Sequence, residues 1–225
     1  NVVADGQCHG FPLLAPSFQL DVDRFAEHVI RTEANVAVVV TPNNPTSLRV
    51  PKAELVRLLD KLAGHDCMLI VDESFMDFAN DGSEHTLEGE LERYPNLTIM
   101  KSMSKVYGAC GVRLGYLLTA NQIFAERVRA EVPIWNINGL AESFLRLIPR
   151  YRRNFASSCE RVRADRDHLY EALSEIPGMV VWQPDANFVF CRLPNGAVDG
   201  PEVTRSMFVQ HNILIKHCAG KTMPH

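Results

Sequence analysis

The sequence predicts an α/β protein with a three-layer domain built on a mostly parallel sheet. Two observations lead to this prediction. Short apolar runs rich in β-branched residues alternate with stretches of helical length, which is the strand–helix–strand order of parallel sheets. The first three apolar runs also end in polar residues, as strands that finish at one rim would. A different spacing follows, so we expect a large domain over residues 1–148 and a small α+β domain over 149–225.

The strands and helices of the large domain can be justified in order. Residues 36–40 (VAVVV) are predicted to form a buried strand that ends in the turn cluster TPNNPTS. Pro51 can begin a helix because its missing N–H is no loss in the first turn. Leucines 55, 58, 59 and 62 then share one face of that helix, and Gly64 can end it. Further strands are expected at residues 67–73, 97–102 and 115–119.

The remaining elements are shorter or more polar. Helices are predicted at residues 121–132 and 141–148, Pro149 interrupts, and a long charged helix covers 150–176. The runs MVVW (179–182), NFVFCRL (187–193) and NILIK (212–216) are expected to be strands, with a helix at 202–210 between the last two. These short strands and helices are the predicted small domain.

Composition and charge argue against several classes of protein. The chain is 46% hydrophobic and 22% charged, which is ordinary for a globular protein, and its net charge of −4 comes with dispersed basic residues. We therefore expect no nucleic-acid partner, and with no apolar run of spanning length and no signal peptide we expect no membrane partner. Six scattered cysteines without a C-x-x-C pair favour neither a disulfide framework nor zinc, so we expect no metal and a cytoplasmic protein. The chain begins with Asn rather than Met, so we expect it to be a fragment.

Polar groups follow three successive strands. An amide, Asn44, lies in the NNPT turn; a carboxylate, Asp72, ends the second strand; and the third ends in hydroxyls and lysines with Arg113 beyond them. Taken singly, each has a common structural explanation: a turn, a helix cap or ion pair, a solvated surface charge. Because the carboxyl ends of parallel strands meet at one rim, their order suggests a single ligand site.

These motifs resemble a known family. PNNPTS, LIVDESFMDF, SMSKVYGACGVRLGY and ANFVF occur in the order found in fold type I pyridoxal-phosphate enzymes of the class I and II aminotransferase group, and the resemblance spans essentially the whole chain. The branches most similar are histidinol-phosphate aminotransferase and threonine-phosphate decarboxylase. The resemblance implies pyridoxal 5'-phosphate as cofactor and a homodimer that completes each site with residues from the partner.

The resemblance also implies a role for each site residue. Lys105 would hold the cofactor's aldehyde as a Schiff base and later move the substrate's α-proton. Lys101 lies within the strand, so solvation at a strand edge is the expected explanation for it. Asp72 would keep the ring nitrogen protonated, and Asn44 would donate to the ring oxygen.

The cofactor's phosphate needs donors as well. Ser102 and Ser104 offer hydroxyls, and Arg113 offers a fork of N–H groups suited to phosphate. Gly108 and Gly111 would let the intervening loop turn tightly enough to bring Arg113 back to the site.

Some positions depart from the family pattern. Phe75 replaces the usual tyrosine, so one donor to the ring oxygen is missing at this cofactor-contacting position, as in the decarboxylase branch. Ser47 replaces a usual glycine, and only a small local change is expected there. Asn138 and Asn187 could face substrate, but a helix cap and a strand start, respectively, explain them as well.

The resemblance predicts transamination between a small-molecule amino donor and a 2-oxo acid acceptor. The alternatives are decarboxylation of a phosphorylated amino acid and a non-catalytic module of a larger regulator. The full reading frame, or a yellow colour of the purified chain, would help to choose among them.

Overall fold

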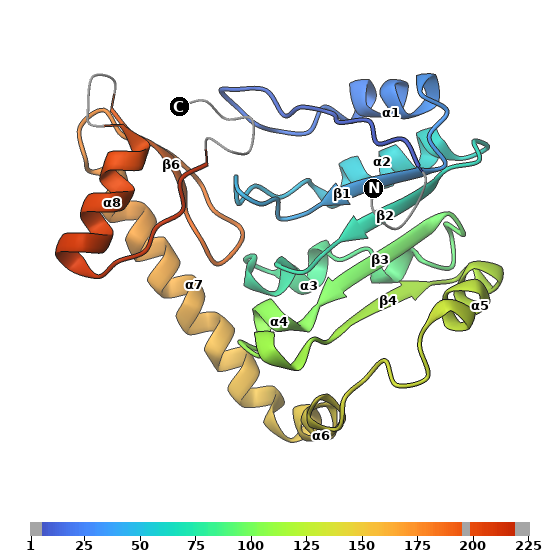
Figure 1. Ribbon diagram of the computed structural model, residues 1–225. Coiled ribbons are helices and arrows are strands. Elements are labelled where there is room, and N and C mark those ends of the chain that lie inside the picture. Colours follow the sequence, from blue (N-terminus) through green and yellow to red (C-terminus); the bar gives the residue numbers. More distant parts are fainter. Residues whose placement is uncertain (1–5, 195–198, 219–225) are drawn as a thin grey trace.

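The main sheet has four strands in the order β1-β2-β3-β4 (Figure 1). The computed structural model describes residues 6–194 and 199–218. The strands are β1 (Val36–Val40), β2 (Met68–Asp72), β3 (Leu97–Ser102) and β4 (Gly115–Thr119). β1 and β3 both run parallel to β2, whereas β4 is antiparallel to β3. The predicted α/β class, with a mostly parallel sheet, is therefore confirmed.

Helices α1 (Val22–Arg31) and α2 (Lys52–Leu62) cover one face of this sheet. The four leucines of α2 are completely buried, as their helical spacing predicts, and Gly64 follows the helix with φ of 86°. Their partners are alternate strand residues such as Leu69, Val71 and Ile99. Helix α1 was not predicted, although Asp21 caps it by accepting from Arg24 N at 3.1 Å.

The opposite face of the sheet carries exposed apolar side chains. Val36, Val38, Met100 and Leu117 lie on this face by register, and Val38 is 53% exposed. The connection from β2 to β3 contains only short helices: η1 (Met76–Phe78), α3 (Gly82–His85) and η2 (Glu88–Glu90). None of these is long enough to form a covering layer. Among the described residues, the helical layer of α1 and α2 thus packs against one face of the sheet, whereas this second face carries exposed apolar side chains.

The chain after β3 begins with two short helices, α4 (Met103–Val106) and η3 (Cys110–Val112). After β4 come α5 (Gln122–Glu131), α6 (Gly139–Leu147), the 3₁₀ turn η4 (Ile148–Tyr151) at Pro149, and α7 (Arg152–Ser174). These bounds agree closely with the predicted helices. No helix in the described residues is long and apolar enough to cross a membrane.

A second, two-stranded sheet lies in the C-terminal part. β5 (Val180–Trp182) pairs antiparallel with β6 (Phe190–Arg192), and α8 (Gly200–His211) follows. The strand predicted at residues 212–216 is wrong. Asn212 adopts φ of 53° and Ile213 N donates back to Met207 O, so the chain turns away from the helix without pairing to another described strand.

A buried arginine ties α7 to the main sheet's loops. Arg166 is 4% exposed and donates from Nη1 to Phe78 O at 2.8 Å and to Ala186 O at 3.2 Å. The bond to Phe78 O fixes the turn after β2 against α7. The division into domains at residues 148 and 149 remains a prediction.

Candidate functional site

The carboxyl ends of β1, β2 and β3 lie at one edge of the sheet. Val40, Asp72 and Met100 form one row across the three strands, and the antiparallel β4 begins opposite Ser102. The loops that follow β1, β2 and β3 therefore all leave from this edge, where α4 lies in Figure 1. The residues predicted to contact the cofactor all belong to these strand ends or loops: Asn44, Asp72, Phe75, Ser102, Ser104, Lys105 and Arg113.

Asp72 is the last residue of β2, and its carboxylate is held by the residue two positions on. Ser74 donates to Asp72 Oδ1 through its backbone N at 2.9 Å and through its hydroxyl at 2.5 Å. The Ser74 hydroxyl in turn accepts from Ser102 N at 2.8 Å. A hydrogen-bonded link thus joins the end of β2 to the end of β3, and sequence reasoning missed Ser74.

A second acidic residue, Glu73, points into the protein next to Asp72. It is completely buried and accepts from Thr86 Oγ1 at 2.6 Å and from Leu87 N at 2.9 Å. Burial raises the pKa of Glu73, although these hydrogen bonds and Lys101 act in the opposite direction. Glu73 therefore fixes the loop after β2, a role that its place beside Asp72 did not reveal.

The serine–lysine segment forms one helical turn beyond β3. Ser102 is the N-cap of α4 and accepts from Ser104 N at 3.4 Å. Met103, Ser104 and Val106 are buried, whereas Lys105 is exposed. The buried side chains hold the turn so that the amine of Lys105 faces outward, and Ser102 has the more accessible of the two hydroxyls.

Arg113 lies on the loop that returns to β4. Its backbone is left-handed, with φ of 57°, and its Nη1 donates to Cys110 O at 3.2 Å. Gly108, with φ of 62°, supplies the predicted tight turn. Asn138 caps α6 by accepting from Ala141 N at 2.9 Å and donates to Val112 O at 3.3 Å. The cap interpretation of Asn138 is confirmed, and the same side chain holds the loop of Arg113.

Lys101 does not sit at a strand edge. β3 lies between β2 and β4, and the Lys101 side chain is only 12% exposed, with its Nζ 2.7 Å from Asp77 Oδ2. Burial alone would lower the pKa of Lys101, but the charge and hydrogen bond of Asp77, together with Tyr116 and Glu73, raise that pKa overall. The expectation of strand-edge solvation is therefore wrong: Lys101 is a buried ion-pair partner.

The NNPT turn is joined to the C-terminal part of the chain. Asn44 is exposed, and Ser47, with φ of 62°, is completely buried. Ser47 accepts from Asp185 N at its carbonyl (2.8 Å) and from Ala186 N at its hydroxyl (2.9 Å). Serine at this position therefore makes more than the small local change that was expected. Asn187, just beyond, is exposed and precedes β6 by three residues.

Phe75 is buried and offers no hydrogen-bond donor. Its ring lies edge-on to that of Phe188, with centroids 5.2 Å apart. Tyr107, on the loop after Lys105, packs in the same cluster and stacks on Phe155 at 4.5 Å. The aromatic cluster therefore contributes apolar packing rather than polar contacts.

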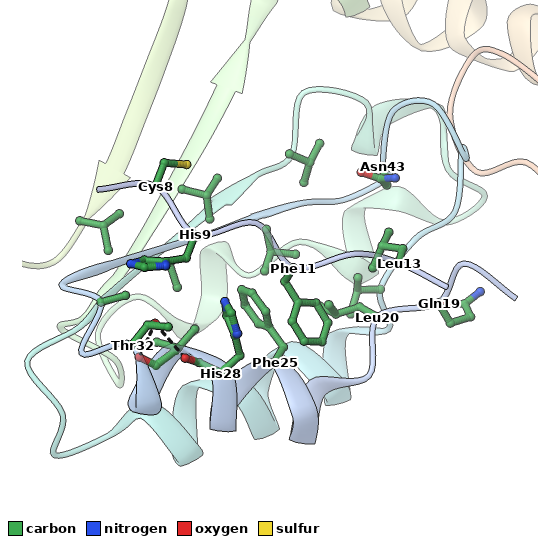
Figure 2. Close-up of a pocket in the computed structure, with 18 of the residues that line it drawn as sticks. Cys8, His9, Phe11, Leu13, Gln19, Leu20, Phe25, His28, Thr32 and Asn43 are labelled. Atoms are coloured by element: carbon green, nitrogen blue, oxygen red, sulfur yellow. Dashed lines mark hydrogen bonds between the residues drawn. The ribbon is translucent and has the colours of Figure 1, made fainter. Parts of the chain in front are cut away.

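A cavity of about 350 Å³ lies elsewhere, between residues 7–20, α1 and β1 (Figure 2). Phe11, Phe25 and His28 point into it, and none of the nominated site residues lines it. We place the candidate site at the strand ends because the charged and polar groups gather there. Among the described residues, no group of three or more His, Cys, Asp or Glu side chains could hold a metal ion.

The donor set at the strand ends fits a phosphorylated aldehyde with a ring nitrogen. An exposed amine, hydroxyl and guanidinium donors, and a carboxylate with one oxygen already fixed are all present, at Lys105, Ser102, Arg113 and Asp72. Arg113 uses one of its five N–H groups on its own loop, which leaves donors for an anion.

Comparisons with known proteins are consistent with this arrangement. A family model described as Aminotransferase class I and II matches residues 3–224. The CMP-5'-(3-aminopropyl)phosphonate synthase of Streptomyces rubellomurinus is 48% identical over all of this chain and 35% of its own length. The histidinol-phosphate aminotransferase of Francisella philomiragia is 29% identical over 85% of this chain and 53% of its own. The chain thus spans about a third to half of these curated relatives.

Solved structures are similar as well. A decarboxylase from Sulfurospirillum multivorans matches with a TM-score of 0.82 and 29% identity, over 93% of this chain and 60% of that one. The histidinol-phosphate aminotransferase from Clostridium acetobutylicum gives 0.83 and 27%, over 93% and 61%.

Proposed function

Because the chain belongs to the class I and II aminotransferase family, whose members are pyridoxal-phosphate enzymes, we propose that it binds this cofactor through Lys105 and acts at the amino-bearing carbon of an amino acid or amine. The observation that carries the proposal is the common sheet edge that gathers Lys105, Asp72, Ser102 and Arg113. Each of these side chains could bind one group of the cofactor: its aldehyde, its ring nitrogen or its phosphate.

Each residue would bind a different group of the cofactor. The Ser102 hydroxyl and the Arg113 guanidinium would donate to its phosphate, with Ser104 supporting the turn. Asp72 would hold a proton on its ring nitrogen, and Asn44 would donate to its ring oxygen. The bound cofactor supplies an electron sink for the substrate carbon. Lys105 would hold the aldehyde and, once released by the substrate's amine, take the proton from the substrate or return it.

Transamination is the reaction that the family resemblance predicts, with a 2-oxo acid as acceptor. Decarboxylation is the second candidate, and the observations favour it. Phe75 removes a donor that the aminotransferases usually have. The 48% identical relative is named for an aminopropyl phosphonate, an amine without a carboxyl group, and a similar structure is a decarboxylase. We therefore propose a substrate that is an amino acid with a phosphate or phosphonate group, and loss of its carboxyl group.

Product analysis distinguishes the two reactions. The purified protein would be incubated with pyridoxal phosphate and a set of ω-phosphono and phosphorylated amino acids, with and without 2-oxoglutarate. We expect carbon dioxide and a primary amine that need no acceptor. An oxo acid formed only when 2-oxoglutarate is present would mean transamination instead, and cofactor binding without any product would refute catalysis on these substrates.

We also propose a homodimer in the cytoplasm. Ile134 and Trp135, between α5 and α6, are 93% and 92% exposed, which is unusual for such large apolar side chains. All six cysteines are free, which fits a reducing compartment. Light scattering should give twice the mass of one chain, and Trp135→Ser should lower it toward one chain; a wild-type monomer that turns over substrate would contradict the dimer.

A further inference from the structure

Ser74 connects two residues of the candidate site, Asp72 at the end of β2 and Ser102 at the end of β3. It belongs to the loop after β2 and is only 5% exposed. It follows Asp72 by two positions along the chain, but it also contacts Ser102, which is 28 residues away. Nothing in its sequence position marks it as functional.

The hydroxyl of Ser74 acts both as a donor and as an acceptor. Its proton goes to Asp72 Oδ1 at 2.5 Å, and its oxygen accepts the backbone N–H of Ser102 at 2.8 Å. The parallel ladder between β2 and β3 continues to the bond from Glu73 N to Met100 O. The side chain of Ser74 therefore takes up the next backbone donor of β3 after the ladder has ended.

The bonds from Ser74 fix how the Asp72 carboxylate is turned. Both the backbone N–H and the hydroxyl of Ser74 bind the same oxygen, Oδ1. A carboxylate with two donors on one oxygen cannot rotate freely, so the other oxygen, Oδ2, keeps a defined direction. Because Ser74 is buried and bonded to Ser102, this direction is set relative to the end of β3.

We propose that Ser74 is a positioning residue, which orients Asp72 toward the ring nitrogen of the cofactor and couples that carboxylate to the phosphate-binding Ser102. The inference rests on the proposed function, because it assigns a target to Asp72. With Ser74 in place, Oδ2 is the oxygen presented to the ring nitrogen, and the spacing between the carboxylate and Ser102 is fixed. The Ser74 hydroxyl would thus help to position both the group that binds the ring nitrogen and the group that binds the phosphate.

The test compares Ser74→Ala with Ser74→Thr, which keeps the hydroxyl, and with Ser83→Ala, an exposed serine in the same connection between β2 and β3. The first readout is the pH midpoint of the visible absorbance of bound pyridoxal phosphate. We expect Ser74→Ala to move this midpoint in the same direction as Asp72→Asn, and Ser74→Thr and Ser83→Ala to leave it near the wild-type value. The cofactor's dissociation constant should also rise in Ser74→Ala, by up to about tenfold, because the loosened Asp72 carboxylate must then be ordered when the cofactor binds.

The double variant Asp72→Asn with Ser74→Ala separates positioning from general support. If Ser74 acts through Asp72, adding Ser74→Ala to Asp72→Asn should not move the midpoint further. A Ser74→Ala midpoint equal to wild type, or a shift of the same size in both backgrounds, would overturn the proposal.

A measurement without cofactor checks the geometry itself. The Ser102 amide should exchange its hydrogen at least about tenfold faster in Ser74→Ala than in Ser83→Ala, because its acceptor is gone. Unchanged exchange would refute the bond and the inference with it. If Ser74→Ala and Ser83→Ala differ in exchange as expected but wild-type protein binds no cofactor, the bond is real and the proposed function is refuted, together with the target assigned to Asp72.

Discussion

Ser47 offers the most quantitative test of the packing around the site. It combines a left-handed backbone, complete burial and two hydrogen bonds to the segment before β6. Ser47→Ala removes the hydroxyl that accepts from Ala186 N and keeps the strained backbone. Ser47→Gly removes the same hydroxyl but relieves the strain, so the pair separates the two effects.

The magnitudes follow from the structure. Ala186 is completely buried, so losing the acceptor leaves an unpaired N–H that costs about 1–3 kcal/mol. A left-handed backbone costs an L-residue about 1–2 kcal/mol, which glycine avoids. Glycine loses about 0.4–1 kcal/mol of this advantage because its unfolded chain is more flexible. The free energy of unfolding of Ser47→Ala should therefore be about 1–3 kcal/mol lower than that of wild type. That of Ser47→Gly should be about 0.5–1 kcal/mol higher than that of Ser47→Ala.

Urea unfolding followed by circular dichroism measures these differences through the midpoint, provided that the slope stays constant. An exposed serine such as Ser83, changed to alanine, serves as the control. A stability of Ser47→Ala equal to wild type, or of Ser47→Gly below Ser47→Ala, would show that the hydroxyl and the backbone angle do not have the roles assigned to them.

Three further changes test the site and its surroundings. Asp72→Asn should lower turnover roughly 10²-fold, about 2.7 kcal/mol of barrier, with cofactor still bound; steady-state rates within a few-fold of wild type would return Asp72 to a structural role. Burial raises the pKa of Glu73, so the folded chain holds the carboxyl proton more tightly than the unfolded chain, and the wild-type protein loses stability as the pH rises above the ordinary glutamate pKa of 4.5. Glu73→Gln has no such proton to lose, so the melting temperature of this variant minus that of wild type should increase from pH 4 to pH 7. A difference that stays constant over this pH range would contradict the prediction. Lys101→Met should cost about 1–2 kcal/mol of unfolding free energy by leaving Asp77 unpaired, whereas an unchanged midpoint in urea would mean that the ion pair contributes nothing.

The strands were predictable because each is a β-branched or apolar run bounded by turn residues, and α2 because its leucines recur at helical spacing. Helix α1 shows the same kind of pattern, with Val22, Phe25, Ala26 and Val29 buried behind the cap Asp21. The helical spacing of these apolar residues, preceded by a capping aspartate, is therefore sufficient to predict this helix from the sequence. The run at residues 212–216 was misjudged for a different reason, because a strand needs a partner, and partners are set by the tertiary fold.

The candidate site divides in the same way. The order of Asn44, Asp72, Lys105 and Arg113 along the chain indicated a common edge, because parallel strands end together. The burial of Lys101 was not visible, since it depends on β4 lying on the far side of β3. The link from Asp72 through Ser74 to Ser102 depends on the β2–β3 register, which no local pattern specifies.

The most direct test of the central claim is to find which lysine carries the cofactor. The protein would be saturated with pyridoxal phosphate, reduced with borohydride, digested and mapped by mass spectrometry, with Lys105→Ala as the control. We expect the pyridoxyl mass on Lys105 and no label in the control. Label on the buried Lys101, or on no lysine at saturating cofactor, would contradict it.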